Sequence, residues 1–254
     1  MWHGDYLFLL RNLVLKDFRT RYRNMSLGVL WSLVNPLIMM TVLTFVFTRI
    51  FPVTKTPNYP LVVLCGLVPF NFFSLAWANG TTSIIDNAQL IKRVPVPRDV
   101  MPVASVLGNA VHLSVQVALL LLMALAFGAG INRHWVWLPV LWICELVFVC
   151  GCSFLCAALD VYIRDMRYVV ESASTVLFWL VPIFYPVTMI RPQYVTLYQF
   201  NPITALVMAL RYILLDGVTP PNRLLFLLIM VSFGMLAFGW MSFRRLSHGF
   251  YNYL

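Results

Sequence analysis

Six apolar runs, each close to the length of a membrane-spanning helix, dominate this 254-residue sequence. A helix needs about 20 consecutive apolar residues to cross the hydrocarbon core of a bilayer. The runs are residues 27–48, 60–78, 100–129, 135–158, 169–186 and 224–243. Because 61% of the residues are hydrophobic and only 11% are charged, the chain has too little polar surface for a soluble globule. The sequence therefore predicts an all-α integral membrane protein, with six transmembrane helices in a single membrane domain over residues 1–254.

The distribution of basic residues predicts how the protein is oriented in a membrane. Lys plus Arg outnumber Asp plus Glu by 18 to 9, and most of the surplus lies in short segments between the apolar runs. Six spans place both termini on one side, which also holds the loops 84–99 and 160–168 and twelve of the 18 basic residues. The positive-inside rule makes that side cytoplasmic. The surplus therefore signals membrane orientation and not nucleic-acid binding, and both termini are predicted to be cytoplasmic.

The N-terminal segment, residues 1–26, is predicted to lie in the membrane interface. It lacks the basic start and the small-residue cleavage site of a signal peptide, so the first spans are expected to insert uncleaved. Apolar residues recur there at helical spacing, at Leu7, Leu10, Val14, Phe18 and Tyr22, and a polar stripe lies opposite them. Such a helix lies among the interfacial lipids and does not cross the bilayer. It serves either as a simple lipid anchor or as a gate or partner-contact helix.

A second segment, Ile203 to Leu215, is apolar but too short to cross the membrane. It is interrupted by Arg211 and stands between an Asn-Pro and an Asp-Gly dipeptide. Backbone that enters the membrane without crossing it must be buried in protein or line a cavity. This segment is therefore predicted to be re-entrant or interfacial.

The sequence offers little catalytic chemistry. It contains no G-x-x-x-x-G-K-[ST] phosphate loop, no H-E-x-x-H and no G-x-S-x-G motif. The five cysteines lie inside apolar runs, where helix packing is a commoner role than metal binding or disulfide formation. Glu145 is the only carboxylate well inside a span, and it either has a functional role or makes an interhelical hydrogen bond. The chain is thus predicted to be no enzyme, to bind no metal and to have no ATPase site of its own.

The third apolar run carries a polar face. Ser105, Asn109, His112 and Gln116 follow one another at steps of four, three and four, which places them on one side of a helix. Such side chains avoid lipid, so they either hold helices together or line a wet translocation path. Aromatic residues gather near span ends, around 69–73 and 183–186. An interfacial belt explains many of them, and stacking on sugar rings is the alternative.

The stretch 87–103, NAQLIKRVPVPRDVMPV, concentrates charge and proline in an otherwise apolar chain. Ser83 is predicted to cap a short cytoplasmic helix over residues 84–93, with an acidic first turn and a basic last turn. This helix carries a narrow apolar stripe, made of Ile84, Ala88 and Ile91. Because a mere connector does not need a capped helix with an apolar stripe, the pattern predicts docking on a partner protein.

Several motifs, taken in order, resemble those of one family of transport proteins. They are RYRNMSLGVLWSLVNPLIM at 21–39, GLVPFNFF at 66–73, NAQLIKRVPVPRDVMP at 87–102, LDVYIRDMRY at 159–168, PIFYP at 182–186, NPIT at 201–204 and FRRLSHGF at 243–250. Along nearly its whole length the chain resembles the membrane subunits of ABC exporters of cell-surface polysaccharides. This type-2 permease family includes O-antigen, capsule and teichoic acid exporters.

The resemblance implies a homodimer in the bacterial inner membrane, with a continuous pore at or near the subunit interface. Two separate ABC ATPase subunits would supply ATP and Mg, and the permease itself would bind no cofactor. The implied substrate is a lipid-linked polysaccharide. Two alternatives remain open, namely a related type-2 permease for drugs or lipids and a membrane enzyme that acts on lipid-linked sugars.

The resemblance also assigns roles to segments and residues of this chain. Residues 190–216 are expected to form short periplasmic gate helices. The expected ATPase-coupling helix consists of Ile84, Ile85, Asp86, Asn87, Ala88, Gln89, Leu90, Ile91, Lys92 and Arg93. The expected cytoplasmic gate helix carries Lys16, Arg19, Tyr22 and Arg23. The candidate contacts with the pore or the substrate are Trp31, Asn35, Phe72, Phe73, Asn109, His112, Gln116 and Tyr185.

Overall fold

The computed structural model of this chain describes residues 5–22, 31–50, 57–94, 96–250 and 253, and all of its regular elements are helices. The α-helices are α1 (Tyr6–Tyr22), α2 (Trp31–Phe45), α3 (Tyr59–Asp86), α4 (Ala88–Arg93), α5 (Val100–Ala126), α6 (Leu138–Tyr162), α7 (Met166–Leu180), α8 (Pro192–Gln199), α9 (Pro202–Leu214) and α10 (Asn222–Ser247). A π-helical turn, Val46–Ile50, extends α2, and a 3-10 turn, Arg133–Trp137, precedes α6. The predicted all-α membrane architecture is confirmed.

Five helical stretches of the described residues are long and apolar enough to cross a bilayer. They are Trp31–Ile50, Tyr59–Arg93, Val100–Ala126, Arg133–Tyr162 and Asn222–Ser247. They correspond to five of the six predicted spans. The predicted start of the first span, at residue 27, lies outside the described part of the chain.

The predicted span 169–186 ends early in the structure. Its helix, α7, has 15 residues and stops at Leu180, which corresponds to a length of about 22 Å. Pro182 explains the stop, because a proline lacks a backbone donor and disfavours helical geometry in the residue before it. Val181 accordingly has extended geometry, with φ −71° and ψ 136°. A sixth crossing that includes the non-helical residues 181–186 stays a prediction.

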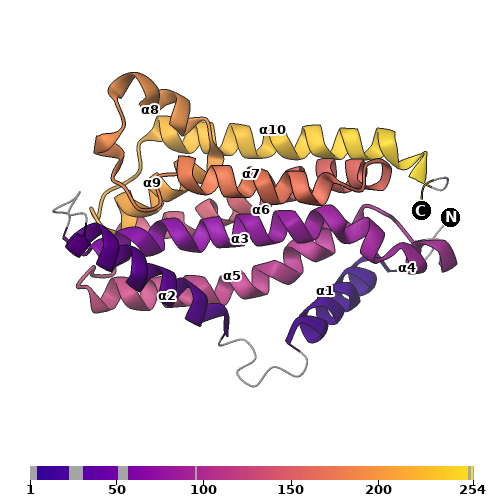
Figure 1. Cartoon of the computed structure of the whole chain (residues 1–254), viewed down its shortest axis with the longest axis horizontal. Helices are drawn as coiled ribbons and strands as arrows, with labels where there is room; N and C mark the ends of the chain where they lie inside the picture. The colour runs from indigo at the N-terminus through magenta and orange to yellow at the C-terminus, as the bar shows by residue number, and fades with distance from the viewer. Residues whose placement is uncertain (1–4, 23–30, 51–56, 95, 251–252, 254) are drawn as a thin grey trace.

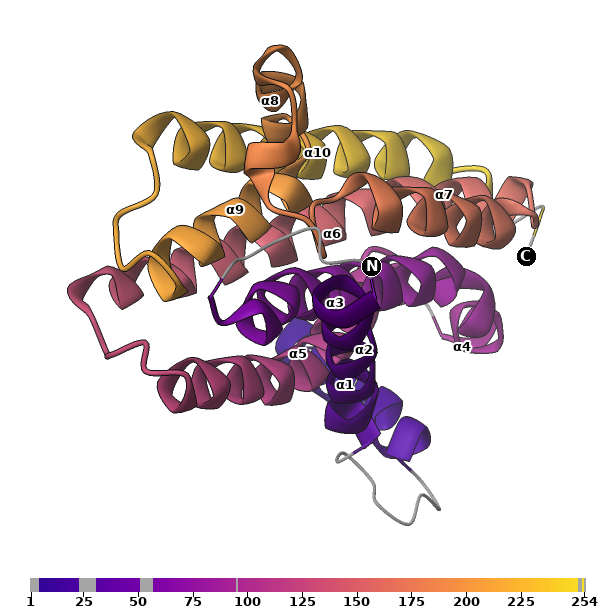
Figure 2. The same ribbon diagram turned by 60° about the vertical axis from the view of Figure 1, so that its left-hand side comes forward.

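α3 forms the centre of the bundle (Figure 1). It packs against α2, α5, α6, α7 and α9, and α6 packs in turn along α10. Figure 1 shows α1, α4 and the C-terminal end of α10 at one end of the bundle, and α8 and α9 toward the other. In the turned view of Figure 2, α8 stands outside the bundle beyond α10. A large apolar core fills most of the bundle, and a smaller core joins α1 to the ends of α3, α5, α6 and α10 at the α4 end.

The short helix α9 confirms the predicted length of the apolar segment near residue 203. It has 13 residues, and nearly all of them are buried against α3, α6 and α10. Asn201 begins the helix, because its side-chain oxygen accepts a hydrogen bond of 3.0 Å from the Ile203 amide. Protein therefore covers the backbone at this end, as the predicted re-entrant path requires. The re-entrant path itself stays a prediction.

Candidate functional site

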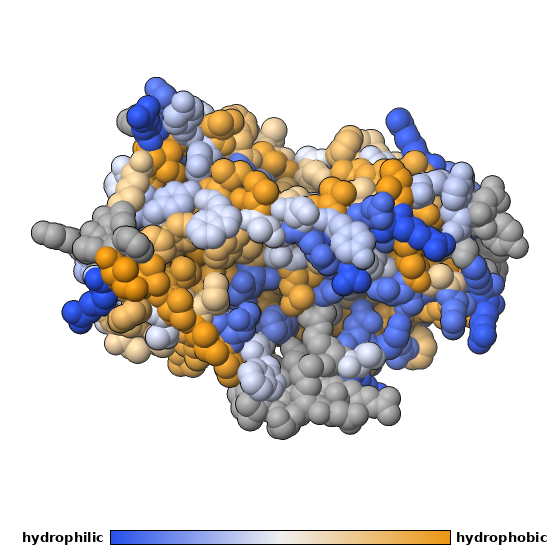
Figure 3. Space-filling model, in the orientation of Figure 1, coloured by the Kyte–Doolittle hydropathy of each residue, from blue (hydrophilic) through white to orange (hydrophobic). Residues whose placement is uncertain are grey.

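A polar cavity of about 630 Å³ lies between α2, α3 and α5. We call it the central cavity. Its lining residues are Trp31, Ser32 and Asn35 of α2, Phe70, Asn71, Ser74, Leu75, Ala78 and Asn79 of α3, and His112 and Gln116 of α5. Figure 3 shows hydrophilic side chains reaching the middle of this face beside α2, between apolar regions. Polar groups at this depth in a membrane protein face other protein or water, because hydrocarbon cannot satisfy them.

Helical periodicity places these side chains on one wall. Asn71, Ser74 and Ala78 recur on α3 at steps of three and four, which keeps them on one face of that helix. On α5, His112 and Gln116 are four residues apart, and their Nε2 atoms lie 3.2 Å from each other. The Gln116 amide also donates to the carbonyl oxygen of Ser32 at 3.1 Å. The cavity wall therefore contains a polar connection between α5 and α2.

The structure brings together four of the eight candidate pore contacts. Trp31, Asn35, His112 and Gln116 line the central cavity, and half of the Trp31 side chain is exposed. Asn109 lies next to the cavity but is buried, where it accepts a hydrogen bond of 3.2 Å from the Asn79 amide. On the polar face of the third span, Asn109 joins two helices, as one of the two interpretations predicted, and His112 and Gln116 line a cavity. That this cavity is a translocation path stays a prediction.

The remaining candidates, Phe72, Phe73 and Tyr185, lie elsewhere. Phe72 and Phe73 are buried in the large apolar core, on the side of α3 opposite Asn71 and Ser74. They do not line the central cavity, and the sequence does not show which face of an apolar helix meets its own core. Tyr185 follows α7 toward the α9 end, and its hydroxyl donates to the Leu180 carbonyl at 2.7 Å. Seven residues of the cavity wall were not among the candidates, and three of them, Asn71, Ser74 and Ala78, carried a signal in their helical spacing.

A second polar pocket of about 350 Å³ lies next to the central cavity, toward the α4 end. We call it the α1 pocket; it is lined by Lys16, Asp17, Thr20, Asn79, Ser83, Asp86, Asn87 and Ser105. Asn79 lines both cavities. The Lys16 ammonium donates to the side-chain oxygen of Asn87 at 2.7 Å, which ties α1 to the joint between α3 and α4. The helix α1, which was expected to act as a gate, therefore lines a polar pocket next to the central cavity.

The other expected gate residues are placed only in part. Arg19 is exposed on α1, while the side chain of Tyr22 and the whole of Arg23 lie outside the described residues. The apolar face of α1 packs against α5 through Leu13, which is buried in the smaller core. Burial and then the nearby carboxylate of Asp99 raise the pKa of Tyr6. The start of α1 is thus close to the start of α5.

The helix predicted over residues 84–93 differs from the structure in two ways. It begins at another residue, and it exposes another face. Ser83 does not cap a helix, because α3 continues to Asp86 and the Ser83 hydroxyl donates back to the Gly80 carbonyl at 2.6 Å. Ile84 is completely buried in the smaller core, and Ile91 and Leu90 pack against that core. The predicted apolar docking stripe was therefore wrong at Ile84, which no partner can reach, whereas docking through the half-buried Ala88 and Ile91 stays a prediction.

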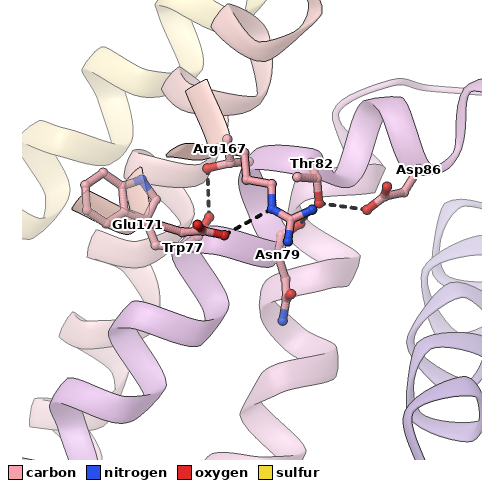
Figure 4. Close-up of polar contacts among 7 residues, drawn as sticks. Trp77, Asn79, Thr82, Asp86, Arg167 and Glu171 are labelled. Atoms are coloured by element: carbon pink, nitrogen blue, oxygen red, sulfur yellow. Dashed lines mark hydrogen bonds and ion pairs between the residues drawn. The ribbon is translucent and has the colours of Figure 1, made fainter. Parts of the chain in front are cut away.

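The exposed side of the coupling segment is polar. It consists of Asp86, Gln89, Lys92 and Arg93, whereas Ile85, Asn87 and Ala88 are half-buried. The Asp86 carboxylate accepts a hydrogen bond of 2.7 Å from Thr82. On α7, Arg167 pairs with Glu171 at 3.0 Å. Figure 4 shows the Arg167 guanidinium reaching from α7 toward Thr82 and Asp86 of α3. The joint before α4 therefore carries charged groups that a partner protein can contact.

Comparison with known proteins identifies the family. The sequence model described as ABC-2 type transporter matches residues 9–215. The chain belongs to the ABC-2 type transporter family. It is 30% identical over 214 residues to the O-antigen export system permease protein RfbA of Klebsiella pneumoniae, which covers 84% of this chain and 82% of the relative. A protein of the same name from Myxococcus xanthus is 29% identical over 234 residues, with 91% and 90% covered. The polysialic acid transport protein KpsM of Escherichia coli is 25% identical over 210 residues, with 81% and 80% covered.

Arg211 of this ABC-2 subunit was noticed in the sequence only as an interruption of an apolar segment. In the structure it is 8% exposed and its guanidinium donates to backbone carbonyls around the break after α7. The acceptors are the carbonyl oxygens of Val62 at 3.3 Å, Ile183 at 2.9 Å, Tyr185 at 3.1 Å and Pro182. No carboxylate of the described residues forms an ion pair with it. Arg211 therefore joins α9, α3 and the non-helical residues 182–185.

Glu145 of the ABC-2 subunit is buried in α6, with 1% of its surface exposed. Neither of its carboxylate oxygens has a hydrogen-bond partner among the described residues. The predicted interhelical hydrogen bond was therefore wrong. None of the cavities described above includes Glu145, so the geometry gives it no functional assignment.

Proposed function

We propose that this chain is the permease through which an ATP-driven transporter exports a lipid-linked polysaccharide, O-antigen or a related glycan, across the bacterial inner membrane. The names of its relatives, which refer to O-antigen export and polysialic acid transport, support the substrate class. The observation that carries the proposal is the central cavity, a polar space at the depth of the spanning helices.

The cavity has the chemistry that a passing glycan requires. Amide and hydroxyl groups, such as those of Asn71 and Ser74, exchange hydrogen bonds with sugar hydroxyls. Trp31 and Phe70 offer aromatic faces to the C–H faces of sugar rings. In a single chain this polar wall would be open to lipid, which is unfavourable. A second copy of the chain is proposed to enclose it as a homodimer.

An ABC ATPase is the proposed energy-supplying partner, in two copies. The chain contains no phosphate loop, so ATP and Mg are assigned to the ATPase and no cofactor to the permease. The ATPase is proposed to contact the exposed polar side of residues 84–93.

The ATPase is a cytoplasmic partner in this proposal, so the α4 end and both termini are assigned to the cytoplasm. The gate helices of residues 190–216 are assigned to the periplasm. α1 is proposed to gate the cytoplasmic mouth, with Lys16 bound to Asn87.

Filling the central cavity is expected to stop export. Ala78 lines the cavity on α3, and an indole in Ala78→Trp would occupy the space that a sugar needs. Surface polysaccharide should fall to background, and lipid-linked glycan should accumulate inside the cells. Leu122→Trp is the matched control, because Leu122 is 65% exposed on α5 and lines neither the central cavity nor the α1 pocket. Normal export by Ala78→Trp at wild-type protein levels would reject this cavity as the path.

Reversing charge on α4 is expected to weaken binding of the ATPase. Lys92 and Arg93 are exposed, so Lys92→Glu with Arg93→Glu should turn attraction into like-charge repulsion against an acidic partner surface. Co-purification with the ATPase should drop at low salt and recover in part as added salt screens the repulsion, while the permease stays folded. Arg133→Glu, an exposed reversal before α6, provides the control. If the α4 variant and the control retain equal amounts of ATPase, the docking assignment fails.

A further inference from the structure

A basic pocket of about 480 Å³ lies where the start of α5 meets the end of α10. Its lining residues are Arg98, Asp99, Phe243, Arg244, Ser247 and His248. Two arginines stand against one aspartate, so the pocket carries a surplus of positive charge even with a neutral histidine. Neither the central cavity nor the α1 pocket shares any of these residues. The proposed transport path therefore leaves this pocket without a role.

Both arginines are held in place. The Arg98 guanidinium donates to the Ser247 carbonyl and lies over the Phe250 ring, 5.8 Å from its centroid. The Arg244 guanidinium lies over the Trp240 ring, 3.9 Å from its centroid. Phe243 and Phe250 are buried beneath them. These contacts hold both guanidinium groups in place before an anion binds. Binding therefore loses little side-chain conformational entropy.

An apolar stripe on α10 leads directly to this pocket. Its large members are Phe226, Met230, Phe233 and Met241, each at least half exposed. The stripe continues at helical spacing to Arg244 and His248, which are also exposed. On a membrane-spanning helix an exposed apolar face meets acyl chains, and Trp with Arg at its end marks the level of the headgroups. Acyl chains along the stripe thus bring a headgroup to Arg244.

We propose that the basic pocket binds an anionic phospholipid, phosphatidylglycerol, with its phosphate between Arg98 and Arg244. Basic pockets between membrane helices on the cytoplasmic side are suited to anionic headgroups. A single negative charge matches the surplus of one positive charge. The glycerol hydroxyls of the headgroup donate to the Asp99 carboxylate, which would repel a more highly charged phosphate. The bound lipid would connect the linker that follows α4 with the end of α10. This proposal does not depend on which substrate the transporter carries.

The test measures lipid retention and thermal unfolding of the full-length chain purified in detergent and stripped of lipid. Native mass spectrometry should show one tightly held phosphatidylglycerol per chain, and adding this lipid should raise the unfolding temperature. Arg244→Gln should weaken binding about tenfold or more, because it removes a charge-assisted hydrogen bond. Arg245→Gln is the matched control, since Arg245 is exposed and does not line the pocket.

A conservative variant and a set of alternative ligands distinguish phosphatidylglycerol binding from misfolding, from binding of any phosphate and from a protein contact. Arg244→Lys should retain most of the binding, which shows that a loss in Arg244→Gln is not misfolding. Equal stabilisation by phosphatidylcholine, phosphatidylethanolamine or inorganic phosphate would overturn the assignment. Equal lipid binding by Arg244→Gln and Arg245→Gln would overturn it too. If Arg244→Gln keeps the lipid but loses the co-purifying ATPase, the pocket belongs to the protein partner and the proposal is wrong.

Discussion

Replacing Gly239 with alanine is expected to destabilise the protein severely. α6 and α10 approach each other so closely that a Cβ atom on Gly239 would overlap the carbonyl oxygen of Gly151. A Cβ on Gly151 would itself lie 2.6 Å from the Leu236 amide nitrogen. The obstacle in both cases is backbone, which cannot rotate away as a side chain can. Small residues are what permit such contacts between membrane helices. Forcing the helices apart should cost about 3 kcal/mol or more.

Gly234 on the same helix provides the control for Gly239→Ala. A Cβ atom at Gly234 would meet no atom within 4 Å, so Gly234→Ala should unfold at or slightly above the wild-type temperature. Thermal unfolding in detergent and the yield of monodisperse protein measure both variants. Equal unfolding temperatures for Gly239→Ala and Gly234→Ala would show that α6 and α10 do not pack through this contact.

This contact also shows what the sequence could not predict. The apolar runs predicted where most helices lie, because hydrophobic length is a local property of the chain. The pairing of Gly151 with Gly239 depends on which helices become neighbours, and no local pattern contains that information. The sequence did contain a local signal for the early end of α7, because Pro182 lies inside the predicted span. Hydropathy alone did not detect it, because proline breaks a helix without making the run polar.

Part of the candidate site was predictable because polar residues interrupt an apolar helix. His112 and Gln116 stood out on α5 for that reason, and they line the central cavity. Phe72 and Phe73 are as apolar as the core that buries them, so their orientation could not be inferred from composition. Ile84 illustrates the same limit at the coupling segment. Its spacing predicted that it belongs to an exposed apolar stripe, but Ile84 is buried in the protein's own core.

Replacing Arg211 with methionine is expected to disrupt the α9 end of the bundle. The carbonyl groups of Pro182, Ile183 and Tyr185 would lose their donor in a buried environment, and unsatisfied buried groups cost about 1–3 kcal/mol each. Removing a desolvated cation offsets part of this cost, so the expected net loss is about 3 kcal/mol. Because Pro182 interrupts α7, the chain at 182–185 has no helical hydrogen bonds to replace those from the guanidinium.

Two variants separate the geometry of the guanidinium from its charge. Arg211→Lys keeps the charge but loses the planar fork that reaches several carbonyls at once, so its unfolding temperature should lie between those of wild type and Arg211→Met. Arg223→Met removes an exposed arginine at the start of α10 and should leave stability unchanged. Export should fall with Arg211→Met even at a temperature where the protein stays folded, because α9 and residues 182–185 would no longer be held together. If Arg211→Met matches Arg223→Met in both stability and export, the guanidinium does not hold this end of the protein.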